Sequence, residues 1–198
     1  MDNERDHQRM SQRRKAGYDK KQAKATQEKG LLMVYTGPGK GKSTAAFGMG
    51  LRILGHGMRL GVVQFIKGAM ECAERRFFSQ MDGCEFTAMG DGFTWITQNR
   101  DQDILSAQRA WDKAQTMLES KRFDMLIFDE LNIILHYGYL ELETVLAAVQ
   151  ARQPNTHVVI TGRNAPEPLI EQADLVSEIR AIKHPYKAGI KAQAGVEF

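Results

Sequence analysis

The residues whose types and spacing have the clearest chemistry lie near the start of the chain. A glycine- and lysine-rich stretch comprises Gly37, Pro38, Gly39, Lys40, Gly41, Lys42, Ser43 and Thr44. It follows an apolar run at 31–35, which predicts a buried strand, and precedes an apolar run at 45–51, which predicts a helix. Glycines let the backbone curl so that several N–H groups point inward, and the helix N-terminus adds partial positive charge. The stretch therefore predicts a loop that binds a polyphosphate.

The positions within this loop have separate expected roles. We expect residues 37–44 to contact a nucleotide, with the Lys42 ammonium reaching its outer phosphates. The Ser43 hydroxyl stands where a magnesium ligand belongs. Thr36 occupies the position of the usual first glycine, so the pattern has a non-standard opening. The competing interpretation is a glycine turn between a strand and a helix that happens to contain lysines.

A second feature lies far downstream. The apolar run at 125–128 ends in Asp129 and Glu130, a pattern that resembles the acidic end of a second buried strand in nucleotide-binding proteins. Such carboxylates hold Mg²⁺ or Mn²⁺, directly or through water, beside the hydroxyl of the phosphate loop. The sequence therefore predicts a metal site made by Ser43, Glu130 and Asp129.

Composition limits the class of protein. The chain has 198 residues, of which 42% are hydrophobic, which suits one substantial core and a single domain. No apolar run is long enough to span a bilayer, and the N-terminus lacks a signal-peptide pattern, so we expect a cytoplasmic protein with no membrane partner. Cys72 and Cys84 fit no metal spacing and are expected to be reduced thiols. The five histidines are scattered, which argues against a zinc site.

Residues 1–29 form a distinct, basic arm. They hold nine Lys and Arg against five Asp and Glu, so the positive charge of the chain belongs to this arm and the rest is nearly neutral. The arm contains no Val, Ile, Leu, Phe or Trp, and we expect it to be mobile by itself. Because it lacks Pro, it can form a helix on contact with something else. It is either a solvated tail or a lid over an anionic ligand, on this subunit or on a neighbour.

From residue 30 to residue 198 the pattern alternates between strands and helices. Strands are predicted at 31–35, 59–66, 85–89, 125–129, 158–161 and 175–179, and helices after the phosphate loop, at 101–119 and at 142–149. This alternation predicts an α/β fold with a single-domain, doubly wound, mostly parallel sheet. Trp111 lies on the apolar stripe of its helix and is expected in the core.

Several loops should meet at the carboxyl edge of this sheet, where ligands bind in such folds. Besides the phosphate loop, they are 67–68, 90–95, 129–130 and 162–164. The loop at 90–95 presents Phe93 and Trp95 from a segment without helical or strand periodicity. These rings either pack into a small satellite core or form a wall for a large, flat, apolar ligand.

The motifs together resemble one family. The phosphate loop, the segments at 61–68 and 92–100, Asp-Glu-Leu-Asn at 129–132, Ile-Thr-Gly-Arg at 160–163 and the ending at 188–198 are similar to the ATP:corrinoid adenosyltransferases of the P-loop type. The resemblance runs from about residue 30 to the last residue. It implies a P-loop nucleotide-binding (RecA-like) domain.

The resemblance also implies a reaction and its partners. ATP would give its 5′-deoxyadenosyl group to the Co(I) centre of a corrinoid (cobalamin, cobinamide or an a,c-diamide precursor) and leave tripolyphosphate, in adenosylcobalamin biosynthesis and salvage. Family members hold ATP in the direction opposite to most P-loop proteins, which exposes C5′. Lys42, Phe93 and Trp95 would be catalytic, the two aromatics by displacing the lower axial ligand of cobalt. A homodimer, in which the basic helix covers the active site, and a flavoprotein-type electron donor are also implied.

The chain departs from the family pattern in places. Pro38 replaces the common Asn, Ser43 replaces the more usual Thr, and the segment 69–74 lacks the Trp and Gly that members often carry there. Two other functions are also considered. An ATPase or small-molecule kinase would release ADP, and a nucleic-acid-binding module would use the basic arm. The nearly neutral body argues against nucleic acid as a partner.

Overall fold

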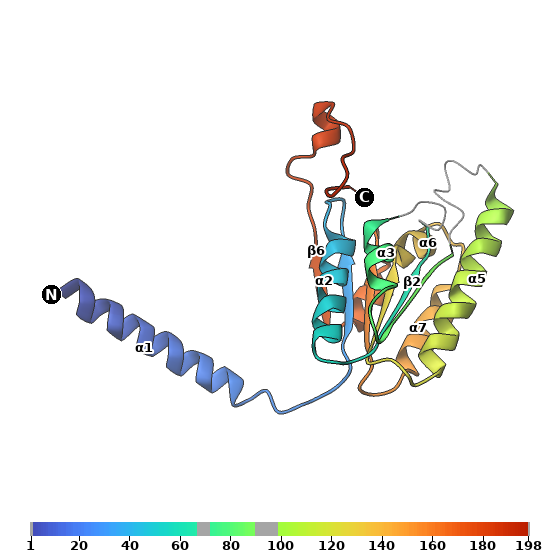
Figure 1. Ribbon diagram of the computed structural model, residues 1–198. Helices are drawn as coiled ribbons and strands as arrows, with labels where there is room; N and C mark the ends of the chain where they lie inside the picture. Colours follow the sequence, from blue (N-terminus) through green and yellow to red (C-terminus); the bar gives the residue numbers. More distant parts are fainter. Residues whose placement is uncertain (1, 67–71, 90–98, 198) are drawn as a thin grey trace.

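The computed structural model describes residues 2–66, 72–89 and 99–197, which form a parallel sheet flanked by helices (Figure 1). The strands are β1 (Leu32–Thr36), β2 (Leu60–Gln64), β3 (Cys84–Ala88), β4 (Met125–Asp129), β5 (His157–Thr161) and β6 (Leu175–Glu178). Their spatial order is β3-β2-β4-β5-β1-β6, and each neighbouring pair is parallel. The predicted α/β class and parallel sheet are confirmed, with strand ends that differ by at most two residues.

Helix α1 (Asp2–Gln22) precedes the strands, and the 3₁₀-helix η1 (Pro185–Ala188) follows them. The helices described between strands are α2 (Lys42–Gly55), α3 (Ala73–Phe78), α5 (Arg100–Glu119), α6 (Leu131–His136), α7 (Leu142–Gln150) and α8 (Glu167–Gln172). The predicted helices correspond to α2, α5 and α7. The sequence did not predict α3, α6 and α8, because six residues are too few to display a helical period.

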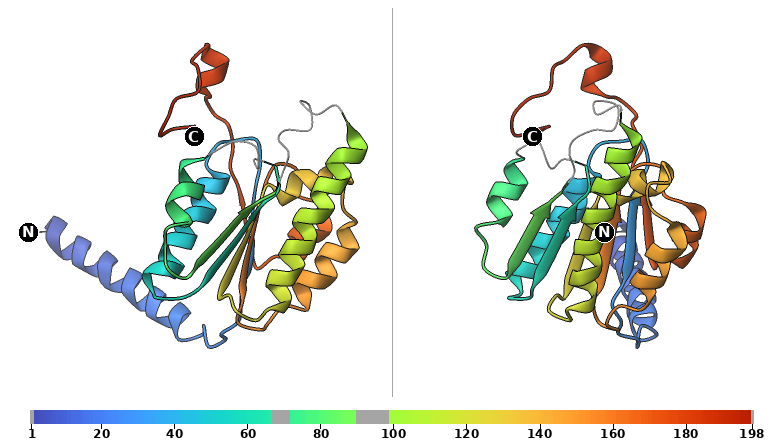
Figure 2. Two further views of the ribbon diagram at one scale, coloured as in Figure 1. Left: turned by 45° about the vertical axis from the view of Figure 1, so that its right-hand side comes forward. Right: turned by 90° about the vertical axis from the view of Figure 1, so that its right-hand side faces the viewer.

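The helices cover both faces of the sheet, which gives three layers (Figure 2). Alternate residues of β4 face opposite layers: Ile127 packs in the cluster that contains Phe47 of α2, and Phe128 packs in the cluster that contains Trp111 of α5. Burial of both faces explains why the strands are continuous apolar runs. Trp111 is 2% exposed, which confirms its predicted place in the core.

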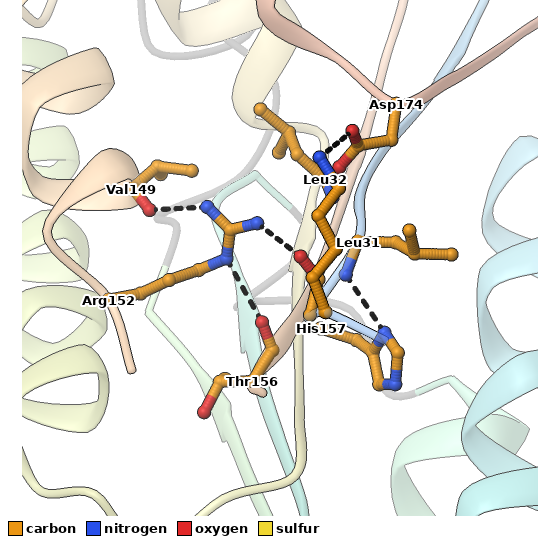
Figure 3. A network of polar contacts seen from close by, with 9 residues as sticks. Leu31, Leu32, Val149, Arg152, Thr156, His157 and Asp174 are labelled. Carbon is orange, nitrogen blue, oxygen red and sulfur yellow. Dashed lines mark hydrogen bonds and ion pairs between the residues drawn. The ribbon is translucent and has the colours of Figure 1, made fainter. Parts of the chain in front are cut away.

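A polar network holds the edge of the sheet opposite the phosphate loop, where β1 begins (Figure 3). The Arg152 guanidinium donates hydrogen bonds to the backbone carbonyls of Val149, Gly30 and Thr156 at 2.7, 2.7 and 3.0 Å. Burial lowers the pKa of Arg152, and the charge of Asp174 opposes that effect. One side chain thus ties the end of α7 to the start of both β1 and β5.

Asp174, the residue before β6, completes this network. Its Oδ2 accepts a hydrogen bond from the Leu32 backbone N–H at 2.9 Å, and its other oxygen pairs with the Lys29 ammonium. The pKa of Asp174 is lowered, first by its hydrogen bond from Lys29 and then by the one from Leu32. Just before β1, the Leu31 N–H donates to His157 Nδ1 at 3.0 Å.

Replacing Asp174 with Asn should therefore destabilise the fold in a pH-dependent way. The lowered pKa means that the ionised carboxylate stabilises the folded state above its ordinary pKa of 3.8, and this contribution is lost as the pH falls through the folded value. We expect Asp174→Asn to cost no more than about 1 kcal/mol at pH 7, because the Lys29 partner is half exposed. Urea unfolding at pH 7 and pH 3 would test this. A difference from wild type that is equally large at both pH values would contradict it.

The N-terminal arm differs from the rest of the molecule. Helix α1 projects away from the sheet, and residues 6–29 are exposed (Figure 1). A helix without packing partners gains no stability from tertiary contacts. In the part of the chain that the structure describes, neither this helix nor any other is long and apolar enough to cross a membrane.

Candidate active site

The phosphate loop joins β1 to α2, and its glycines are required by geometry. Gly37 and Gly41 have φ values of 99° and 111°, in the region that favours glycine. Gly39 lies so close to the segment after β6 that a Cβ would stand 2.7 Å from Ile179 O and from the Arg180 carbonyl carbon. The Gly39 N–H donates to Ile179 O at 2.7 Å. The loop is therefore held against the end of β6.

Lys42 lies at the centre of this loop. Its ammonium donates hydrogen bonds to Gly37 O at 2.9 Å and to Gly39 O at 2.7 Å, and the residue is only 8% exposed. The first turn of α2 also includes Ser43, half-buried, and Thr44, exposed. The carbonyls of Gly37 and Gly39 thus fix the position of the Lys42 ammonium at the loop.

Thr36, the departure from the usual glycine, has a structural role. Its Oγ1 accepts a hydrogen bond from the Ala165 N–H at 3.1 Å. The hydroxyl therefore attaches the loop after β5 to the start of the phosphate loop. A glycine at this position lacks that acceptor.

Asp129, at the end of β4, is fully buried and has a partner on each oxygen. Oδ1 accepts from the Thr161 hydroxyl at 2.7 Å, and Oδ2 accepts from the Gln64 amide at 2.8 Å. The parallel register explains this arrangement, because Gln64 and Asp129 are paired across β2 and β4, and β5 is the neighbour on the other side. Three adjacent strands thus end in polar side chains that contact one another.

Glu130 follows directly and has a left-handed backbone, with φ of 66°. Its N–H donates to the Thr161 hydroxyl at 2.9 Å. Since Tyr35 pairs with Thr161 across β1 and β5, the acidic pair and the phosphate loop lie at the same sheet edge on either side of β5. This edge offers oxygen atoms that could bind a metal ion: the Ser43 hydroxyl and the two carboxylates. Hard oxygen ligands of this kind suit Mg²⁺ or Mn²⁺.

The loop after β5 is fixed to α6. Gly162 has φ of 129°, and a Cβ there would stand 2.9 Å from the Asn132 Cβ. The Asn132 amide, fully buried, donates to Gly162 O at 3.1 Å. Both ends of the segment 162–165 are therefore attached, one to Asn132 and the other to Thr36.

The C-terminal segment returns to the phosphate loop. After β6 the chain extends past η1 and then turns back toward the start of α2 (Figure 1). There Glu197 forms an ion pair with Lys40. The last residues of the chain thus contact a loop that lies more than 150 positions earlier in the sequence.

The two aromatic residues predicted to act on the corrinoid, Phe93 and Trp95, lie outside the described residues, as do Lys67 and Gly68. The structure therefore brings together only part of the predicted site: the phosphate loop, Ser43 at its end, and the Asp129–Glu130 pair. Sequence reasoning missed Gln64, because the strand was predicted to run to residue 66, whereas β2 ends at Gln64.

The parallel sheet, the glycine loop between β1 and α2, and the acidic pair after β4 define the class of P-loop nucleotide-binding domains. A solved structure with a similar fold is that of the flagellar accessory protein FlaH from Methanocaldococcus jannaschii. It aligns with a TM-score of 0.51 at 14% identity and covers 76% of this chain and 71% of its own. At that identity the likeness concerns the fold alone.

Sequence comparison then gives the family. Residues 28–198 match the model of the family described as ATP:corrinoid adenosyltransferase BtuR/CobO/CobP. The chain is 51% identical to a corrinoid adenosyltransferase of Pseudomonas aeruginosa, over 97% of this chain and 95% of the relative. It is 45% identical to one of Escherichia coli K12 over the full length of both chains. The chain belongs to the ATP:corrinoid adenosyltransferase family.

Proposed function

We propose that this protein is an ATP:corrinoid adenosyltransferase, which transfers the 5′-deoxyadenosyl group of ATP to the Co(I) centre of a corrinoid and releases tripolyphosphate. The reaction belongs to adenosylcobalamin biosynthesis and salvage. The observation that carries the proposal is the match to the family over the whole domain, from residue 28 to residue 198. The phosphate loop, whose carbonyls hold the Lys42 ammonium, supports the proposal.

The chemistry needs charge stabilisation more than proton transfer. The electron pair of Co(I) forms a bond to C5′, and the C5′–O bond breaks with its electrons going to the triphosphate. Negative charge therefore grows on the leaving group, and Lys42 and the loop N–H groups would stabilise it. Neither a protein nucleophile nor a general base is required.

We propose that Ser43 and Glu130 hold the nucleotide-bound Mg²⁺ or Mn²⁺, with Asp129 acting directly or through water. The metal would neutralise part of the triphosphate charge. The hard oxygen donors at one sheet edge support this assignment. Because each Asp129 oxygen already accepts one hydrogen bond, contact through water fits its surroundings best.

We also propose that α1 is a lid that covers the active site in a homodimer. The basic composition of the arm suits a polyphosphate site, and the exposure of residues 6–29 leaves α1 available for a second subunit. A flavoprotein-type donor would supply the electron that makes Co(I). The free thiols of Cys72 and Cys84 suit a cytoplasmic location, where thiols stay reduced.

Trp95→Ala should separate the two stages of the reaction. The family resemblance assigns this side chain to displacement of the lower axial ligand, which makes Co(II) easier to reduce. We expect the rate from Co(II) to fall by at least about tenfold, whereas transfer to chemically pre-reduced Co(I) stays within about threefold of wild type. Parallel anaerobic assays from the two oxidation states measure this. Equal losses in both assays would contradict the redox role.

The proposed function is tested by anaerobic incubation with Mg²⁺, ATP and Co(I)-cobalamin while the corrinoid spectrum is recorded. We expect a stable cobalt–carbon product whose spectrum changes on exposure to light. A spectrum that follows only slow reoxidation of Co(I), with or without ATP, would reject the transferase assignment.

A further inference from the structure

We propose that Thr161 and Gln64 are positioning residues that set the geometry of the acidic pair, Asp129 and Glu130, toward the nucleotide-bound metal. This inference rests on the proposed function, because the metal enters with ATP. It concerns residues that would touch neither ATP nor the corrinoid. Its evidence is the set of contacts that joins the ends of β2, β4 and β5.

The Thr161 hydroxyl contacts both acidic residues. A hydroxyl has one proton to donate, and this one is donated to Asp129 Oδ1 at 2.7 Å. The same oxygen accepts the backbone N–H of Glu130 at 2.9 Å. Thr161 is fully buried, so water is not available to replace either bond. A single side chain therefore orients one carboxylate and the backbone of the next residue.

The second contact matters because of the backbone at Glu130. Its φ of 66° lies in a region that residues other than glycine adopt at a cost, and surrounding contacts must hold it there. This turn takes the chain from β4 into α6 and determines the direction in which the Glu130 side chain leaves the backbone. The Thr161 bond is one of the contacts that hold this conformation.

Gln64 holds the other oxygen of Asp129. Its amide Nε2 donates to Asp129 Oδ2 at 2.8 Å, and Gln64 is only 1% exposed. The Cys72 thiol lies 3.9 Å from Gln64 Oε1, where it makes a weak hydrogen bond that favours this amide orientation. A Glu at position 64 would place a second carboxylate against Asp129, so the amide is the group that this position needs.

Together these donors prevent Asp129 from rotating. Each carboxylate oxygen keeps a second lone pair, which remains able to accept from a metal-bound water. Loss of the Thr161 or the Gln64 donor would allow the Asp129 carboxylate to rotate. It would also leave this buried charge with one hydrogen bond fewer. Partners that orient metal-binding groups in this way typically change metal affinity by about 10- to 100-fold when removed.

The test is Mn²⁺ binding in the presence of ATP and without corrinoid, followed by the EPR signal of free Mn²⁺. Thr161→Val, which keeps the shape and removes the hydroxyl, should weaken Mn²⁺ binding by about 10- to 100-fold. Thr161→Ser restores the hydroxyl and should stay within about threefold of wild type. Gln64→Leu, which removes the donor on the other side, should weaken binding over the same range as Thr161→Val.

Thr156→Val is the matched control. Thr156 is also buried and its hydroxyl also donates, to Phe123 O at 3.0 Å, but it lies at the opposite edge of the sheet. We expect it to lower thermal stability while Mn²⁺ affinity stays unchanged. If Thr161→Val does not fold, Gln64→Leu still tests the inference, because Gln64 contacts the other oxygen of Asp129 from β2.

Unchanged Mn²⁺ affinity in folded Thr161→Val or Gln64→Leu would overturn the inference. Equal weakening by Thr156→Val would also overturn it, since the effect would then be general destabilisation. Wild-type protein that binds Mn²⁺ with ATP but does not alkylate Co(I) would reject the proposed function and leave the positioning result standing. The two failures are therefore distinguishable.

Discussion

Lys42→Ala is expected to lower the rate of ATP-dependent adenosyl transfer by about 100- to 1000-fold. The ammonium is held among the loop carbonyls, 2.9 Å from Gly37 O and 2.7 Å from Gly39 O, and in the proposed reaction it would stabilise the charge that develops on the leaving triphosphate. Steady-state rates with saturating Co(I)-corrinoid at varied ATP concentration would measure the loss. A fall in kcat as well as in kcat/KM would mean that the contact strengthens in the transition state.

Lys113→Ala is the control for this variant. Lys113 lies on α5, away from the phosphate loop; it is half-buried, whereas Lys42 is buried, and it makes a 2.7 Å ion pair with Glu85. Its removal should leave adenosyl transfer within about twofold of wild type, because its ion pair is with Glu85 on β3 and not with the phosphate loop. Comparable loss in both variants, or full activity in folded Lys42→Ala, would contradict the site assignment.

Gly39→Ala should also abolish most activity, for a steric reason. The added Cβ would stand 2.7 Å from Ile179 O and from the Arg180 carbonyl carbon, and these backbone atoms cannot rotate away as a side chain does. The phosphate loop must therefore move from the end of β6 and lose the 2.7 Å bond from Gly39 N–H to Ile179 O. We expect at least about a 100-fold loss of transfer, as for other small misplacements of a binding group, and about 1–3 kcal/mol of destabilisation.

Gly48→Ala provides the matched comparison. It is the same substitution on α2, the helix that follows the loop, but a Cβ at Gly48 meets nothing within 4 Å. Alanine in a helix interior should raise the free energy of unfolding by about 0.5–1 kcal/mol and leave transfer intact. Wild-type ATP affinity in Gly39→Ala, measured by calorimetry, would mean that contact with the β6 segment is not what shapes the loop.

The sequence was sufficient to predict those parts of the molecule that have a recognisable local sequence pattern. Continuous apolar runs predicted strands buried on both faces, and the run that ends in Asp129 predicted both β4 and its carboxylate. The phosphate loop was equally clear, because the strand, the glycines and the helix follow one another directly. The family resemblance, carried by motifs along the whole domain, is confirmed by the family match.

The same reasoning could not predict which strand ends contact one another. Gln64 and Asp129 are 65 positions apart, and Thr161 lies 32 positions after Asp129. They meet only because the strand order is β3-β2-β4-β5-β1-β6, which depends on how all the helices pack and leaves no trace in any one segment. The role of Thr36 was hidden in the same way, since its partner Ala165 follows the neighbouring strand.

The most direct test of the account is the identity of the phosphate product made from ATP when Co(I)-corrinoid is alkylated. Attack at C5′ leaves all three phosphates joined, so chromatography of the anaerobic reaction should show tripolyphosphate formed one-to-one with the cobalt–carbon product. ADP and inorganic phosphate with an unchanged corrinoid would mean that the loop serves an ATPase or kinase instead, and would contradict the proposed reaction.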